Sequence, residues 1–329
     1  MDDKMDYSEF QQYILENVQD RAADDCLIYM GSVTRNNGVV CDTLMMRQEE
    51  REATPVLYMG DYYDSYCAGA SLGEIIDHIC RVFGNFQARG ALVTSRWLED
   101  YENVKDHIVM RLVNYGKNEA LLQDCPYIRK MDLALTFRVC VSYEAGGRGS
   151  CLVTDSFMKA WGVDKSQLYE RAVINMNRIW TPVLEPLENF VYSLTEGTCV
   201  REEGETPFPG WRGQGLHVNR GIDGSILMSR YSPQPELYIL STDEKIEGAA
   251  VLFYTDLIRR FAREKECDVI LLPSSIHEFL VLEDSGLRSS SSLRCVVRQV
   301  NKDQVEDEEV LSDHVYRYIR EEDKIVIDA

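Results

Sequence analysis

Apolar residues recur at helical spacing in several parts of the chain. Asp6 and Glu9 form a capping-box pattern, and Phe10, Ile14 and Val18 follow it at four-residue spacing, which predicts an amphipathic helix over residues 7–20. Ser71 and Glu74 repeat this pattern before a second apolar periodicity that ends near Phe83. The same reasoning predicts further helices over residues 164–179, over residues 256–264 and after the serines at 289–292.

Other segments are rich in β-branched and aromatic residues, which is typical of strands. Residues 26–34 and 39–47 are two such runs, and the Asn36-Asn37-Gly38 sequence between them is a strong signal for a hairpin turn. Further strands are expected at residues 55–59, 108–115, 130–143, 150–154, 237–241, 269–272, 279–282 and 314–319.

The order of these elements indicates the fold class. Strands arrive first as hairpins and later as strand-helix-strand units, which favours an α+β fold over a doubly wound parallel sheet. We therefore expect two lobes of mixed, largely antiparallel sheet packed with amphipathic helices.

A segment rich in glycine and proline interrupts this order. Residues 197–235 hold four of the nine prolines and seven of the 21 glycines, a composition that does not sustain regular structure. Long loops of this kind inside compact proteins are usually functional or disordered. We expect an N-terminal α+β lobe over residues 1–196, a Gly/Pro-rich insertion or connector over 197–235, and a C-terminal α+β lobe over 236–329.

Composition and charge narrow the classes of function. Hydrophobic residues make up 45% of the chain and charged residues 27%, a balance that allows a full hydrophobic core. The net charge of −20 disfavours direct binding to nucleic acid or to an anionic membrane. The same charge leaves open an acidic protein that imitates nucleic acid and occupies a basic partner.

The cellular compartment follows from the ends of the chain and from its cysteines. The acidic start of the chain lacks the features of a secretory signal, and the longest apolar run, residues 249–254, is far shorter than the roughly 20 residues of a membrane span. The ten cysteines are scattered and form no C-x-x-C motif, which favours reduced thiols over disulfides or a zinc site. We therefore expect a cytoplasmic protein that does not bind membranes.

The densest group of polar residues follows a predicted buried strand and a proline turn. Ser274, Ser275, His277 and Glu278 contain the side-chain types of a hydrolase, but a serine nucleophile needs a base within hydrogen-bond reach and a third group that orients the base. Neighbouring residues on a strand point to opposite faces, so adjacency alone does not supply this arrangement. A structural role in the turn is the favoured interpretation, and a hydrolase-type site is the alternative.

Metal and cofactor sites have little support in the sequence. The five histidines are far apart, although Asp313-His314 and His277-Glu278 could meet in space. Gly210, Gly213 and Gly215 do not follow the order of a nucleotide-binding motif. We expect neither a metal nor a cofactor.

Aromatic residues provide two weaker candidates for a binding surface. Tyr62 and Tyr63 lie between acidic residues, a combination that suits a ligand groove but also an ordinary strand end. Phe208 and Trp211 lie in the Gly/Pro-rich segment, where a mobile loop could present them to a partner or could bury them.

Several of these segments together resemble a bacterial domain-of-unknown-function family, DUF5688. The resemblance covers nearly the whole chain and is least evident in residues 197–235. It implies a bacterial cytosolic protein and transfers no catalytic residue. The matching segments are residues 36–38, 61–63, 112–115 with Asn118, 161–163 with Leu168 and Asn175, 240–242, 248–250, 272–278, 300–301 and 311–316.

The sequence therefore predicts a non-enzymatic binding or regulatory protein that acts on another cytosolic protein. A hydrolase that uses the residue 274–278 turn and an acidic mimic of nucleic acid are the two alternatives.

Overall fold

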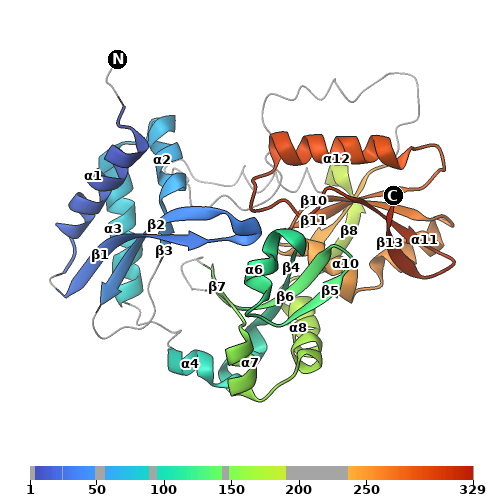
Figure 1. Cartoon of the computed structure of the whole chain (residues 1–329), viewed down its shortest axis with the longest axis horizontal. Coiled ribbons are helices and arrows are strands. Elements are labelled where there is room, and N and C mark those ends of the chain that lie inside the picture. The colour runs from blue at the N-terminus through green and yellow to red at the C-terminus, as the bar shows by residue number, and fades with distance from the viewer. Residues whose placement is uncertain are drawn as a thin grey trace. The chain divides into compact units, whose positions relative to one another are not determined.

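The computed structural model describes residues 4–23, 25–48, 56–88, 95–142, 148–189 and 236–328, and these form a mixed α+β fold (Figure 1). Every strand pair among them is antiparallel. The chain divides into two compact units, the first ending at Val104 and the second beginning at Lys105.

The first unit contains a three-stranded sheet in the order β1-β2-β3 and the helices that pack on it. Asn37 and Gly38 adopt positive φ angles of 60° and 74° in the turn between β1 and β2, as the Asn-Asn-Gly sequence predicts. The elements are α1 (Tyr7–Gln19), β1 (Cys26–Thr34), β2 (Val40–Gln48), β3 (Val56–Tyr58), α2 (Met59–Ala68), α3 (Leu72–Ala88), α4 (Ser95–Glu99) and α5 (Tyr101–Val104).

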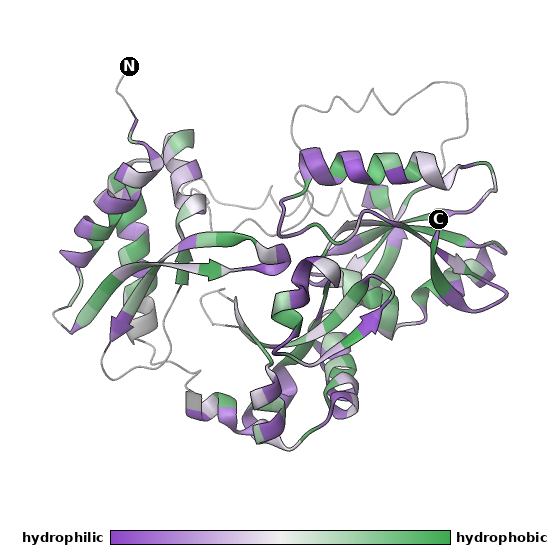
Figure 2. Ribbon diagram, in the orientation of Figure 1, coloured by the Kyte–Doolittle hydropathy of each residue, from purple (hydrophilic) through white to green (hydrophobic). Residues whose placement is uncertain are grey.

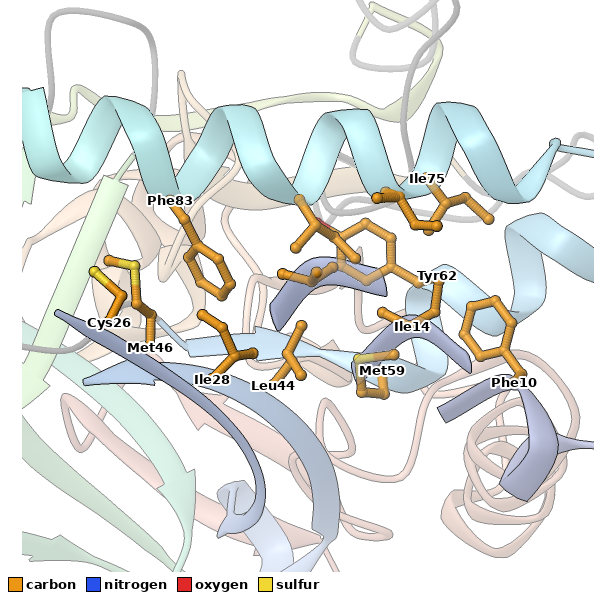
Figure 3. Close-up of a cluster of buried hydrophobic side chains, with 13 residues drawn as sticks. Phe10, Ile14, Cys26, Ile28, Leu44, Met46, Met59, Tyr62, Ile75 and Phe83 are labelled. Atoms are coloured by element: carbon orange, nitrogen blue, oxygen red, sulfur yellow. The ribbon is translucent and has the colours of Figure 1, made fainter. Parts of the chain in front are cut away.

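One hydrophobic core holds this unit together. Apolar side chains at i, i+4 spacing on α1 meet those of α2, α3 and the inner face of β1 and β2 (Figure 3). Phe10, Ile14, Ile75 and Ile79 are fully buried in it. The core therefore joins the first two predicted helices to the predicted hairpin.

The second unit begins with a four-stranded sheet. The long strand β6 pairs with β4 along one edge, and β5 and β7 follow one another along its other edge. Helix α8 packs on β4 and begins with a complete capping box from Asp164 and Gln167. The elements are β4 (Ile108–Asn114), α6 (Glu119–Leu122), β5 (Tyr127–Lys130), β6 (Leu133–Ser142), β7 (Arg148–Leu152), α7 (Asp155–Trp161) and α8 (Lys165–Ile179).

A six-stranded sheet completes the second unit. Its strand order is β13-β12-β10-β11-β9-β8, and helix α12 packs on β10 and β12 over a small apolar cluster that includes Ile270 and Val297. Its central strands are mostly hydrophobic, whereas α12 carries polar and apolar bands (Figure 2). The elements are β8 (Pro182–Pro186), β9 (Tyr238–Thr242), α10 (Val251–Tyr254), α11 (Leu257–Glu264), β10 (Val269–Ser275), β11 (Glu278–Glu283), α12 (Ser290–Gln304), β12 (Val315–Ile319) and β13 (Lys324–Asp328).

The division into units differs from the expected boundaries. The segment at residues 197–235 lies outside the described residues, and the strands on either side of it, β8 and β9, pair with one another in one sheet. Both strands belong to the second unit, and the division falls after Val104. The Gly/Pro-rich composition marks a connection between two neighbouring strands.

Two further observations concern the helices and the cysteines. None of the helices among the described residues is long and apolar enough to cross a membrane. No disulfide joins any of the cysteines in the described ranges.

Candidate functional site: a buried polar cluster in the second unit

The predicted polar turn is shorter than expected. Strand β10 continues through Pro273 to Ser275, and β11 begins at Glu278, so only Ile276 and His277 connect them. The register shifts between Pro273 and Ser275, which is the type of irregularity where a strand tolerates a residue without an N–H donor. The proline therefore lies in a bulged strand and not in the turn that the sequence indicated.

Ser275 and Glu278 are bonded to each other across this connection. The Ser275 hydroxyl donates to Glu278 Oε1 at 3.0 Å and accepts the backbone N–H of His277 at 3.0 Å. Both side chains are buried, with exposed fractions of 6% and 2%. The serine thus closes the connection in the manner of a turn residue.

The His277 ring points to other partners. Its Nδ1 accepts the backbone N–H of Glu247 at 3.2 Å, and its Nε2 lies 3.6 Å from Glu309 Oε1, beyond hydrogen-bond distance. The Ser241 hydroxyl donates to the His277 carbonyl at 2.8 Å. Three separate segments therefore converge on the connection between β10 and β11.

Gly248 allows one of these segments to approach. A Cβ atom at this position would lie 2.3 Å from the His277 carbonyl oxygen and 2.3 Å from Ser241 Oγ. No real side chain tolerates such a contact, so only glycine fits here. The close approach brings the preceding residue, Glu247, against the His277 ring.

Glu247 carries a buried ion pair to the other sheet of the unit. Arg111 Nε on β4 lies 2.8 Å from both carboxylate oxygens of Glu247, and its Nη2 also contacts Oε1. The Glu247 side chain is 7% exposed and the Arg111 side chain 22%. Burial alone would raise the pKa of Glu247, but the arginine outweighs it and lowers the pKa below its usual value.

The two titratable groups of the turn both hold protons more tightly than usual. Burial raises the pKa of Glu278, and the nearby Ser275 and His277 only partly oppose this effect. Burial lowers the pKa of His277, but Glu309 and Glu247 outweigh it and the net pKa is raised. We call the set of Arg111, Ser241, Glu247, Ser275, His277, Glu278 and Glu309 the buried polar cluster.

The hydrogen bonds of this cluster do not join Ser275 to the His277 ring. The Ser275 hydroxyl donates to Glu278, whereas Nδ1 of His277 accepts the backbone N–H of Glu247. Ser274 is only partly buried and helps to stabilise the ionised form of Glu278, opposing the rise in its pKa. The four residues that the sequence selected are brought together, but as a packed connection between strands.

A second polar cluster, also in the second unit, surrounds Asp132. Its carboxylate accepts the hydroxyls of Ser312 at 2.8 Å and Tyr316 at 2.6 Å, and it pairs with His314 Nδ1 at 3.0 Å. The Asn114 side chain donates to the Leu311 carbonyl at 3.0 Å. These contacts join the β5–β6 connection and the end of β4 to the segment before β12.

The sequence left open that Asp313-His314 and His277-Glu278 could meet and hold a metal ion. Within the described ranges, no group of three His, Cys, Asp or Glu side chains is arranged to hold a metal ion. His314 pairs with Asp132 and His277 faces Glu309, so the two histidines belong to different clusters.

The tyrosine candidates lie in the first unit and are part of its packing. Residues 59–68 form helix α2 and not the strand end that the aromatic residues suggested. Tyr62 is 3% exposed and its hydroxyl lies 3.1 Å from His78 Nδ1, while the Tyr63 hydroxyl donates to the Met5 carbonyl at 3.2 Å. Phe208 and Trp211 lie outside the described residues.

Sequence reasoning did not select four members of the buried polar cluster, Arg111, Ser241, Glu247 and Glu309. Arg111 lies in an otherwise apolar strand, Ile108–Asn114, and a charged residue in that position signals a buried partner. Glu247 precedes Gly248-Ala249-Ala250, a run of small residues that permits close backbone approach. Glu309 gives no comparable signal, because it lies in an acidic stretch that resembles a solvated surface.

Comparisons with known proteins give one match. The model of a family of unknown function, DUF5688, matches residues 7–320. No curated protein and no solved structure matches the chain.

Proposed function

The chain belongs to the DUF5688 family of unknown function, and from the geometry of its polar clusters we propose that it is a non-enzymatic binding or regulatory protein of the cytoplasm. The observation that carries this proposal is the pairing in the buried polar cluster. Ser275 is bonded to Glu278 and His277 to Glu247, so the two side chains that hydrolysis would require face different partners.

Burial supports the same conclusion. Ser275, His277 and Glu278 are each less than a tenth exposed, and a reacting group would have to displace the contacts that close the β10–β11 connection. Buried polar side chains that are hydrogen-bonded within a connection stabilise and specify a fold. The family membership adds no activity to this picture.

Helix α12 supplies a surface for a partner. Val296 and Val300, one turn apart, are 55% and 40% exposed, whereas Val297, the next residue after Val296, is buried on the six-stranded sheet. Leu287, in the loop before the helix, is 90% exposed. Exposed apolar side chains that lie close together are a common feature of protein-binding surfaces.

The binding proposal is tested by affinity enrichment from a native cytosolic extract. The baits are the wild-type chain, a Val296→Asp/Val300→Asp variant and a control Ser292→Asp/Gln299→Asp variant that adds the same charge to exposed polar positions of α12. We expect one protein to be enriched by the wild type and the control at several salt concentrations and lost with the valine variant. No enriched protein at any salt concentration would count against a binding role.

The hydrolase alternative is tested separately with a fluorophosphonate probe, which labels activated serines. We expect no difference in labelling between the wild type and Ser275→Ala, because the Ser275 hydroxyl is buried and bonded to Glu278 and not to the His277 ring. Labelling that disappears in Ser275→Ala would favour the hydrolase.

The acidic mimic of nucleic acid has the net charge of −20 as its support. Several acidic residues near the C-terminus are occupied in ion pairs, among them Asp323 with Arg259 and Asp328 with Arg317. This pairing makes the mimic the weaker proposal, because a mimic needs a line of unpaired carboxylates. Displacement of DNA from a basic protein by the purified chain would favour it.

A further inference from the structure

Strand β1 is an edge strand without the features that usually protect an edge. Its nine residues, Cys26–Thr34, contain no charged residue and no proline, and β2 is its single neighbour in the sheet of the first unit. Natural proteins normally protect such edges with charges, prolines or short strands, because unpaired backbone groups recruit other strands.

The other edge strands in the described part of the chain do carry such features. Strand β3 has three residues, β8 has proline at both ends and Glu185 between them, and β13 begins with Lys324 and ends with Asp328. Strands β4, β5 and β7 each contain arginine. The lack of protection is therefore particular to β1.

Two sets of hydrogen bonds show which backbone groups of β1 face outward. At one end, Gln19 from α1 accepts the Ile28 N–H at 2.7 Å and donates to the Cys26 carbonyl at 3.1 Å, so these residues face away from β2. Beyond the other end, the Arg35 N–H donates to the Val39 carbonyl across the hairpin at 2.7 Å. Because the direction alternates along a strand, Met30, Ser32 and Thr34 also direct their N–H and C=O groups outward.

These three residues form an open stretch of edge. The Gln19 side chain occupies the outward positions at Cys26 and Ile28, whereas no described segment pairs with the outward N–H and C=O groups of Met30, Ser32 or Thr34. Ser32 and Thr34 are exposed. The edge therefore offers three donors and three acceptors at two-residue spacing.

We propose that this stretch of β1 pairs with the same stretch of a second copy of the chain, antiparallel and centred on Ser32. Met30 then lies opposite Thr34 of the second copy, and Ser32 lies opposite its own counterpart. All three pairs are of the hydrogen-bonded kind, which gives about six hydrogen bonds and joins two three-stranded sheets into one. This self-association does not depend on the proposed function.

A second copy fits this edge better than a charged peptide. The open stretch has no charge with which to select such a peptide, and its three outward residues are symmetric about Ser32, so an identical strand satisfies every group. The whole chain carries a net charge of −20, so two copies repel each other. Added salt screens this repulsion and leaves uncharged backbone pairing intact, so association strengthens as salt increases.

The experiment compares Ser32→Pro with Ser32→Ala by analytical ultracentrifugation over a range of protein and salt concentrations. Proline removes the outward N–H and is tolerated where that group faces solvent, whereas alanine keeps the N–H. We expect the wild type and Ser32→Ala to form dimers and Ser32→Pro to have a dissociation constant at least about tenfold higher. Equal association of the two variants would overturn the proposal, as would a wild type that stays monomeric while an unrelated peptide binds this edge.

A cross-link tests the pairing even if the proline variant does not fold. Cα atoms of a hydrogen-bonded antiparallel pair are about 5.5 Å apart, within the range that a disulfide spans. On mild oxidation, Ser32→Cys should therefore form a disulfide that joins position 32 of one copy to position 32 of the other, identified by mass spectrometry. The exposed control Ser8→Cys should form no such link. Equal cross-linking of both variants, or none at position 32, would reject the paired edge.

Discussion

The Glu278 carboxyl group is buried, where its ionised form is unfavourable. Burial raises its pKa in the folded chain above the value near 4.3 of an unfolded glutamate. The folded state therefore binds this proton more tightly than the unfolded state. The stability that results is fully present below the unfolded pKa and is lost as the pH rises toward the folded pKa, by up to about 1.4 kcal/mol for each pH unit.

Glu278→Gln should remove this loss. Glutamine cannot ionise, and its side-chain oxygen can still accept the Ser275 hydroxyl. We expect the free energy of unfolding of the variant to rise relative to the wild type between about pH 4 and pH 8, measured by urea unfolding. The control Glu170→Gln changes an exposed residue of α8 and should follow the wild type throughout. Parallel pH curves for wild type and Glu278→Gln would show that Glu278 titrates normally.

Gly248, which contacts the buried polar cluster, is predicted to be difficult to replace. In Gly248→Ala the new Cβ collides with the His277 carbonyl and with Ser241, so the backbone must move. Overpacking of this kind costs about 1–3 kcal/mol, which urea unfolding would detect. Gly116→Ala in the same unit meets only an ordinary contact at 3.6 Å from Asn114 and should change stability by less than about 0.5 kcal/mol. Equal effects of the two substitutions would mean that the close approach at Gly248 is not needed.

At the scale of single elements, the sequence predicted helices and strands well where residues close in the chain determine them. The capping boxes at Asp6, Ser71 and Asp164 each mark the start of a helix. Helix α2 was missed because Tyr62 and Tyr66 have strand propensity, and the packing that makes them helical involves distant partners such as Phe10. Strand β13 was not predicted, although Ile325, Val326 and Ile327 have strand propensity, and it pairs with β12.

The buried polar cluster was also predictable only where its residues are close in the sequence. The residue 274–278 turn was recognisable because its polar residues are adjacent in the sequence. Arg111, Glu247 and Glu309 come from three distant segments, and a single sequence does not tell which distant segments meet. The bonding pattern that argues against hydrolysis therefore emerged only from the structure.

The Asp164 cap gives a prediction at this scale. Its side chain accepts the Gln167 backbone N–H at 2.9 Å, so Asp164→Ala leaves a helix-end donor without its partner. We expect a loss of about 1 kcal/mol in the unfolding free energy of the second unit, measured by urea unfolding. Glu170→Ala, in the middle of the exposed face of α8, is the control and should be nearly neutral. An Asp164→Ala variant as stable as this control would mean that the cap contributes little.

For the whole molecule, the division into two compact units predicts two unfolding events. Phe10 is fully buried in the first unit and Phe279 in the second. Phe10→Ala should lower the stability of residues up to Val104 by about 3–5 kcal/mol and leave the later residues unchanged, and Phe279→Ala should do the reverse. Hydrogen exchange with mass spectrometry separates the two sets of peptides. A loss of protection in both units from either substitution would show that they unfold together.

The pairing of β8 with β9 has a consequence for how this chain can vary. Leu187 donates its N–H to the Leu237 carbonyl at 2.8 Å, so the polypeptide departs from the sheet and returns to it at almost the same point. A connection whose ends are held together in this way can become longer or shorter with little loss of stability, because each doubling of its length costs only about 0.6 kcal/mol of closure entropy. We therefore expect this sheet to accept insertions of very different length between β8 and β9, up to a whole additional domain.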